Sequence, residues 1–261
     1  MAMKLLSAFR TALAALLLAA PVAQALDDAQ RQKLLETIDD RQRNTGDYKA
    51  LVYLEQKEKN KPDVVREAVV YRRDSDDKMM LLLTRPKGET GKGYLRVEKN
   101  LWTYDPNTGK WERRTERERI AGTDSRRADF DESRLAEEFT STFEGEEKLG
   151  QYTTWRLTLK AREGVDVAYP VVKLWVDKAS SNVLKRQELA LSGRLMRTVY
   201  YPKWQKTFSE AKKGEMWYPQ QVRIYDEVEK SNSTMMLIKS VDLKPLQDNL
   251  FTKAWFESKS R

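Results

Sequence analysis

The chain has 261 residues, no cysteine and no histidine, and a formal net charge of +8 from 48 basic and 40 acidic side chains. These absences exclude a Ser-His-Asp triad, a cysteine nucleophile and the His or Cys ligands of a zinc site. The interleaved charges fit a solvated surface, and the basic excess favours an anionic partner such as a membrane surface or an acidic protein.

The first 25 residues have the layout of a secretory signal peptide. The basic residues Lys4 and Arg10 lie in the first ten positions. An apolar run occupies residues 12–18, and a small-residue Ala-Gln-Ala site ends at Ala25. The apolar run is too short to span a bilayer. We expect cleavage near Ala25, which lowers the net charge to +6 and exports the mature protein to the periplasm, where nucleic acid is a poor candidate partner.

The mature chain is expected to begin with a helix over residues 28–44. Leu34, Leu35 and Ile38 recur at helical spacing, and Asp27 suits the N-terminal cap. The apolar stripe predicts that this helix packs on a core.

From residue 48 the apolar period changes to two, which is typical of β-strands. Turn residues separate about a dozen strand-like runs, and no alternation of strands with helices appears, so an antiparallel sheet, sandwich or barrel in one domain is expected. The runs are residues 48–55, 65–71, 79–84, 94–98, 101–104, 110–117, 152–160, 171–177, 183–191, 195–201, 218–228 and 234–243.

Two helical segments interrupt the strand pattern. Residues 131–139 place Leu135 and Phe139 four positions apart, and residues 249–257 collect apolar side chains on one side after a proline. Both segments are expected to pack against the sheet.

Two strand runs, residues 79–83 and 235–238, are apolar on both faces. Such a strand is either covered by protein on both sides or has one face on a ligand cavity, which the adaptable methionines would suit. Adjacent acidic pairs elsewhere point to opposite faces of a strand, so they do not predict a carboxylate-based enzyme.

A family resemblance follows from two motifs. Residues 91–96 read G-K-G-Y-L-R, and residues 101–106 read L-W-T-Y-D-P. This pattern resembles the G-x-G-Y-L-R…L-W-x-Y-x-P signature of outer-membrane lipoprotein-sorting proteins, the LolA-like periplasmic carriers. The signal peptide, residues 120–135 and the closing residues 249–255 agree, so the resemblance covers the mature chain, residues 26–261.

The resemblance implies a mainly β fold: a single curved antiparallel sheet that forms a half-open barrel, with an N-terminal helix and short lid helices over its mouth. It implies a non-catalytic, monomeric carrier without cofactors. Such a carrier binds the acyl chains of lipoproteins or lipids in an apolar cavity and contacts an inner-membrane transporter and, transiently, a membrane. Residues 113–127 are more charged than that family leads us to expect, which leaves the cargo open.

Two sets of site residues follow. One residue of strand register inverts which face a side chain takes, so the first set contains candidates for cavity lining or core. These candidates are Leu81, Leu83, Leu95, Val97, Trp102, Tyr104, Leu135, Phe139, Trp155 and Trp175. Candidates for contact with an acidic transporter or anionic headgroups are Arg113, Arg114, Arg117, Arg119, Arg126 and Arg127, with an ordinary solvated loop as the alternative. An accessory or adaptor subunit of an envelope complex, without lipid cargo, is the alternative function.

Overall fold

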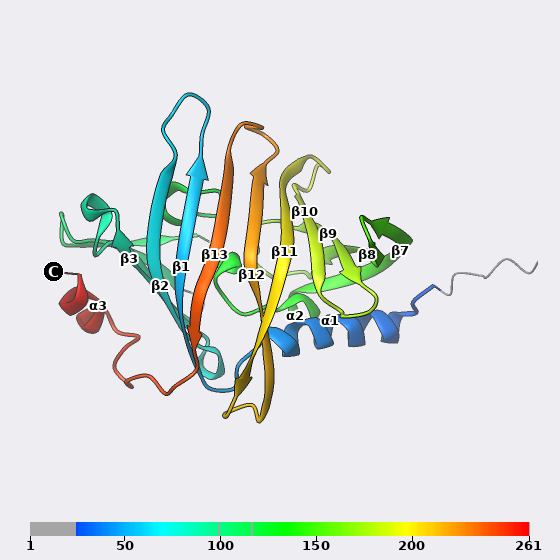
Figure 1. Ribbon diagram of the computed structural model, residues 1–261, viewed down its shortest axis with the longest axis horizontal. Helices are drawn as coiled ribbons and strands as arrows, with labels where there is room; N and C mark the ends of the chain where they lie inside the picture. The colour runs from blue at the N-terminus through cyan, green and yellow to red at the C-terminus, as the bar shows by residue number, and fades with distance from the viewer. Residues whose placement is uncertain (1–24, 99, 116, 261) are drawn as a thin grey trace, which may run out of the picture.

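The computed structural model describes residues 25–98, 100–115 and 117–260. The expected charged and apolar parts of the signal peptide lie outside the described residues. Within them, one antiparallel sheet of 13 strands has the order β6-β5-β4-β3-β2-β1-β13-β12-β11-β10-β9-β8-β7. The sheet curves into a half-open barrel whose two edges, β6 and β7, stay apart, which confirms the expected fold class (Figure 1).

Consecutive strands pair antiparallel, except β6 and β7, which form the two edges of the sheet, and β1 pairs with β13 in the middle. Their bounds are β1 Asp47–Lys57, β2 Val64–Arg73, β3 Lys78–Arg85, β4 Gly93–Val97, β5 Asn100–Asp105, β6 Lys110–Arg114, β7 Phe139–Leu149, β8 Tyr152–Ala161, β9 Val171–Asp177, β10 Val183–Leu189, β11 Leu195–Ser209, β12 Gly214–Asp226 and β13 Ser233–Asp242. The helices are α1 Asp28–Gln42, α2 Leu135–Glu138 and α3 Lys253–Lys259, with short 3-10 turns at Asp74–Asp76, Lys87–Glu89, Ile120–Gly122 and Arg127–Asp129.

Helix α1 begins where the sequence predicts. The Asp27 carboxylate accepts from Gln30 N at 2.8 Å, and the Gln30 side chain accepts from Asp27 N at 2.9 Å, so two otherwise unpaired N–H groups are satisfied. Leu34, Leu35 and Ile38 pack on the concave face of β8–β10. Among the described helices, none combines the length and the apolar character needed to cross a membrane.

The sheet is covered on both faces, but by different elements. On the concave face, Met79, Leu81 and Leu83 of β3 join a core with β1, β2 and β11–β13. On the convex face, Met80 and Leu82 pack under α3 with Phe256. Strand β3 therefore lies between two protein layers, which explains why its alternation lapses.

Several segments differ from expectation. Strand β7, Phe139–Leu149, escaped the sequence analysis because its side chains are mostly polar, as an edge strand with solvent on one face permits. The helix expected at residues 131–139 shrinks to one turn, α2, because residues 131–134 are not helical and form ion pairs through Asp131, Glu132 and Arg134. Helix α3 begins four residues later than expected, where Thr252 Oγ1 accepts from Trp255 N.

Candidate functional site

The connection between the two sheet edges crosses the open side of the barrel. We call residues 117–134 the crossing segment, since they lead from β6 at one edge to α2 and β7 at the other. Ile120 and Phe130 of this segment are buried in the concave core. The crossing segment therefore acts as a cover that is inserted into the barrel mouth.

A cavity of about 140 Å³ lies between the crossing segment, α2 and the concave face of the sheet. It is smaller than the roughly 300–1,000 Å³ of typical small-molecule sites. Its apolar wall consists of Val52, Val70, Leu135, Phe139, Val172, Leu174, Val183, Met216, Val222, Met236 and Ile238, among others.

Charged side chains form the wall beneath the crossing segment. Asp129 accepts from Arg197 at 2.7 Å and 3.0 Å, and Arg197 and Arg186 both pair with Glu188. Burial alone would raise the pKa of Asp129, but the nearby Arg197 and Arg186 outweigh that effect and hold its pKa below the usual value. This cluster fastens the crossing segment to β10 and β11.

A second set of ion pairs fastens the segment to the opposite half of the sheet. Asp131 pairs with Arg96 of β4 at 2.7 Å and also with Arg127. Burial opposes ionisation of Asp131, yet Arg127, Arg96 and Arg72 together lower its pKa. The crossing segment is thus held by buried charges on both sides of the cavity.

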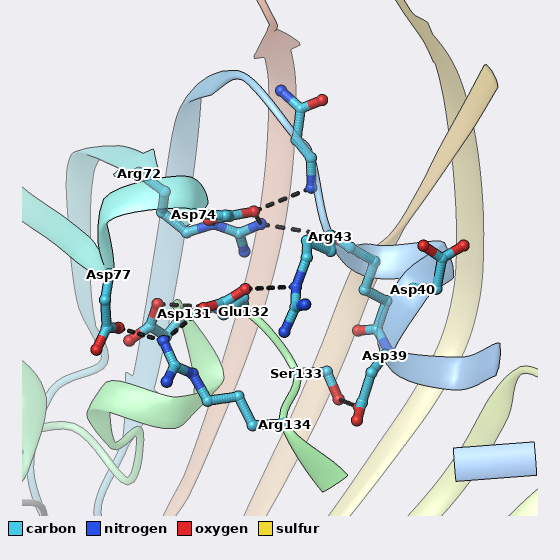
Figure 2. Close-up of polar contacts among 12 residues, drawn as sticks. Asp39, Asp40, Arg43, Arg72, Asp74, Asp77, Asp131, Glu132, Ser133 and Arg134 are labelled. Atoms are coloured by element: carbon cyan, nitrogen blue, oxygen red, sulfur yellow. Dashed lines mark hydrogen bonds and ion pairs between the residues drawn. The ribbon is translucent and has the colours of Figure 1, made fainter. Parts of the chain in front are cut away.

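The end of the crossing segment also meets the end of α1 (Figure 2). Arg43 Nε donates to Glu132 at 2.8 Å, and Arg134 pairs with both Glu132 and Asp77. Asp39 accepts from Ser133 Oγ at 2.6 Å (Figure 2). These contacts make α1, the crossing segment and α2 one connected cover.

Asp39, a residue of α1, caps the N-terminus of α2. Its carboxylate accepts from Leu135 N at 3.0 Å and Ala136 N at 2.8 Å, so a residue of α1 satisfies the first N–H groups of α2. Burial nevertheless raises the pKa of Asp39, more than these bonds and Arg43 lower it.

The G-x-G-Y-L-R motif has a structural explanation in this cover. Tyr94 and Arg96 point to the concave face: the Tyr94 hydroxyl accepts from Ala121 N at 2.8 Å, and Arg96 holds Asp131. Leu95 points to the convex face under α3. A Cβ on Gly93 would lie 2.0 Å from the Leu81 carbonyl oxygen, and one on Gly91 2.4 Å from that of Ser260, so both glycines permit close backbone packing.

The structure distributes the ten predicted lining candidates over both faces of the sheet. Leu135 and Phe139 line the cavity. Leu81, Leu83 and Trp155 lie in the concave apolar layer, outside the cavity wall.

The other five candidates face away from the cavity. The convex layer under α3 contains Leu95, Val97, Tyr104 and Trp102, and the Lys253 ammonium lies 3.8 Å from the centre of the Trp102 ring. Leu174 lines the cavity, so its neighbour Trp175 points to the other face of the sheet. The Trp175 Nε1 atom donates to Glu147 at 3.2 Å.

The predicted arginine cluster is also divided. Arg113 and Arg117 are exposed, and Arg114 is half-buried beside Glu112. Arg119 reaches back to Asp226. Arg126 and Arg127 lie in the cavity wall, and only 12% of the Arg127 side chain is exposed, so these two are part of the cover rather than of a solvated loop.

Several site residues were missed by the sequence analysis. Arg186, Glu188 and Arg197 lie within the strand-like runs 183–191 and 195–201, to which the sequence analysis assigned no site residue. A signal was present: Arg197 shares its parity with Val199 and Tyr201, which are buried or line the cavity. A charged residue in phase with a buried apolar series predicts a buried ion pair.

Comparison with known proteins places the fold. A family model described as "Uncharacterized protein" matches residues 75–258. No curated protein matches the chain by sequence.

Solved structures match over nearly the whole chain. A LolA superfamily protein from Nitrosomonas europaea is similar with a TM-score of 0.73 and 19% identity, over 86% of this chain and 98% of that one. A domain from Vibrio parahaemolyticus that is named for outer membrane lipoprotein sorting is similar with a TM-score of 0.74 and 17% identity, over 87% of this chain and 97% of that one. A DUF1329 family protein from Desulfovibrio piger is similar with a TM-score of 0.74 and 17% identity, over 87% of this chain and 98% of that one. At these identities the likeness shows that the LolA fold is shared.

Proposed function

Since the chain belongs to the family of uncharacterized proteins whose model spans residues 75–258, and has the LolA fold, we propose that it is a periplasmic carrier of acylated cargo. In this proposal the acyl chain of a lipoprotein or lipid enters the cavity under the crossing segment and is sheltered from water. The chain is carried between envelope membranes without covalent chemistry. The signal peptide expected at residues 1–25 delivers the protein to the periplasm.

The observation that supports the proposal is the apolar cavity under the crossing segment. Its wall combines aliphatic and methionine side chains from both halves of the sheet, such as Val70, Leu174 and Met236. An apolar wall suits a flexible hydrocarbon chain, because the burial of apolar surface is not directional and requires no fixed geometry between the partners. An adaptor that carries no lipid has no use for such a cavity.

The energetics require that the cavity opens. Each buried methylene contributes about 0.8 kcal/mol, so even a partly inserted chain gains several kcal/mol. Complete burial of several long chains would exceed the strongest non-covalent affinities, near −18 to −21 kcal/mol, and the cargo would not be released. A carrier therefore needs a cover that moves when it docks, and the crossing segment is the element placed to do so.

The partners in this proposal are an inner-membrane donor and an acceptor membrane or membrane protein, met by a monomeric carrier. The exposed Arg113 and Arg117, next to the open sheet edge β6, are the basic side chains placed to meet an acidic partner.

Native mass spectrometry of the protein extracted gently from its host tests the proposal. The expected result is a population heavier by the mass of a lipid or an acylated protein, which is lost after extraction with organic solvent. A second measurement is displacement of the neutral fluorophore N-phenyl-1-naphthylamine by long-chain lipids. Protein that carries no adduct and binds no lipid in the second assay would contradict the proposal.

A further inference from the structure

The arginines of the cavity wall differ in whether they have an acidic ion-pair partner. Six arginines line the cavity, and five of them face a carboxylate within ion-pair distance: Arg72, Arg127, Arg134, Arg186 and Arg197. Among the residues that the structure describes, Arg126 has no acidic partner within 4.0 Å. Its backbone N–H, not its guanidinium, donates to Asp129 at 2.7 Å.

The guanidinium of Arg126 is also incompletely hydrogen-bonded. Its Nη1 atom is buried and has no hydrogen-bond partner within the described part of the chain. Nε atoms of Arg134 and Arg186 share that property, but their guanidinium groups already pair with Glu132 and Glu188. Buried charges in proteins are normally paired, whereas the half-buried Arg126 has no carboxylate within ion-pair distance among the described residues. Its charge acts on Asp124 only from beyond that distance.

Arg126 is held in place by its surroundings. The Asp129 carboxylate that accepts from its backbone is itself clamped by Arg197. Tyr169, another wall residue, lies in the electrostatic field of Arg126 and Arg197, which lowers the pKa of its hydroxyl while burial raises it more strongly. The unpaired cation thus lies on a fixed part of the wall, in the same cavity as the apolar residues.

We propose that Arg126 binds the anionic headgroup, a carboxylate or a phosphate, of a ligand whose acyl chain occupies the apolar part of the cavity. This inference rests on the proposed function and adds the class of cargo: an acidic amphiphile rather than a neutral one. A guanidinium offers two parallel N–H donors, which match the paired oxygens of either headgroup. Four acidic wall residues, Asp129, Asp131, Glu132 and Glu188, are already paired with other arginines, so they do not compete for Arg126.

Three ligands with the same hydrocarbon chain test the headgroup. Oleate, oleoyl lysophosphatidate and oleyl alcohol are titrated against the full mature protein by displacement of N-phenyl-1-naphthylamine. We expect at least one acidic ligand to bind about tenfold more tightly than oleyl alcohol, and this preference to weaken with added salt. The comparison between oleate and the lysophosphatidate identifies the headgroup that is preferred.

The variant Arg126→Gln is expected to lose this preference: its affinity for the acidic ligand falls about tenfold, and its affinity for oleyl alcohol stays unchanged. Arg194→Gln, at an exposed arginine in the turn between β10 and β11 and outside the cavity wall, is the matched control and keeps the wild-type preference. The wild-type comparison of charged and neutral ligands tests the inference even where the variant folds poorly.

The outcomes separate the two proposals. If the wild type binds all three ligands equally, or if Arg126→Gln retains the acidic preference, the headgroup assignment is wrong while the carrier proposal stands. If the wild type binds none of the three, the carrier proposal itself fails.

Discussion

Arg197 and Asp129 form a buried two-point ion pair, in which Nη1 donates to Oδ2 at 2.7 Å and Nη2 to Oδ1 at 3.0 Å. Both side chains are 3% exposed. Arg197 belongs to β11 and Asp129 to the crossing segment, so the pair fixes the cover on the sheet. The same arginine also pairs with Glu188, which makes it the centre of the cluster.

Substitution of Arg197 by alanine should destabilise the protein strongly. The change leaves Arg186 as the remaining counter-ion of the buried Asp129 and Glu188, and breaking buried ion pairs in this way costs about 3–5 kcal/mol. Urea unfolding followed by tryptophan fluorescence measures the difference. Lys206→Ala, which breaks the half-exposed pair with Glu215, is the control and should cost about 0–1 kcal/mol. Equal losses in the two variants would show that the buried cluster does not stabilise the closed cover.

Gly93→Ala should destabilise the junction between β3, β4 and α3. The added methyl group would lie 2.0 Å from the Leu81 carbonyl oxygen and 2.8 Å from the Phe256 ring, so backbone or ring must shift. Such overpacking costs about 1–3 kcal/mol. Gly88→Ala is the matched control, since nothing lies within 4 Å of its added Cβ. A thermal melt of both proteins decides the matter, and identical melting temperatures would refute the proposed role of the motif glycine.

The stability of the protein should fall in acid, and Asp131 should account for part of the loss. Arg127, Arg96 and Arg72 outweigh burial and lower its folded-state pKa, while the unfolded value is about 3.9. The unfolded chain therefore binds more protons below that value. The stabilising contribution of Asp131 is complete above about pH 4 and is lost as the pH falls through the folded-state pKa.

Urea unfolding of the wild type and of Asp131→Asn, at neutral pH and near pH 3, measures this contribution. We expect the difference in unfolding free energy between the two proteins to shrink in acid, because protonation removes the same charge that the substitution removes. A difference that stays constant between the two pH values would contradict the assignment.

Filling the cavity should weaken lipid binding without unfolding the protein. In Val222→Phe, the larger ring takes space that the acyl chain needs, since Val222 lies in the cavity wall. We expect affinity for oleate to fall roughly tenfold, which corresponds to about 1.4 kcal/mol. Val65→Phe, at a valine that is 53% exposed on β2, should bind oleate as the wild type does. Unchanged binding by Val222→Phe would place the acyl chain elsewhere.

Much of the architecture follows from local sequence patterns. The period-two runs predicted the strands of an antiparallel sheet, and Asp27, Leu34, Leu35 and Ile38 predicted α1, because side-chain direction along a strand or helix depends on spacing alone. The edge strand β7 was missed because its polar side chains do not carry that pattern.

The sequence by itself determined the mainly β class, the opening helix, and the motif glycines and Tyr94 that resemble the LolA-like carriers. Only the tertiary structure decided which face each strand turns to the cavity, because one residue of register exchanges the two faces. It alone brought Asp129 and Asp131 to Arg197 and Arg96, and it placed no carboxylate of the described residues within ion-pair distance of Arg126. Those partners lie 68 and 35 positions apart, and local spacing does not encode contacts between segments so distant in the chain.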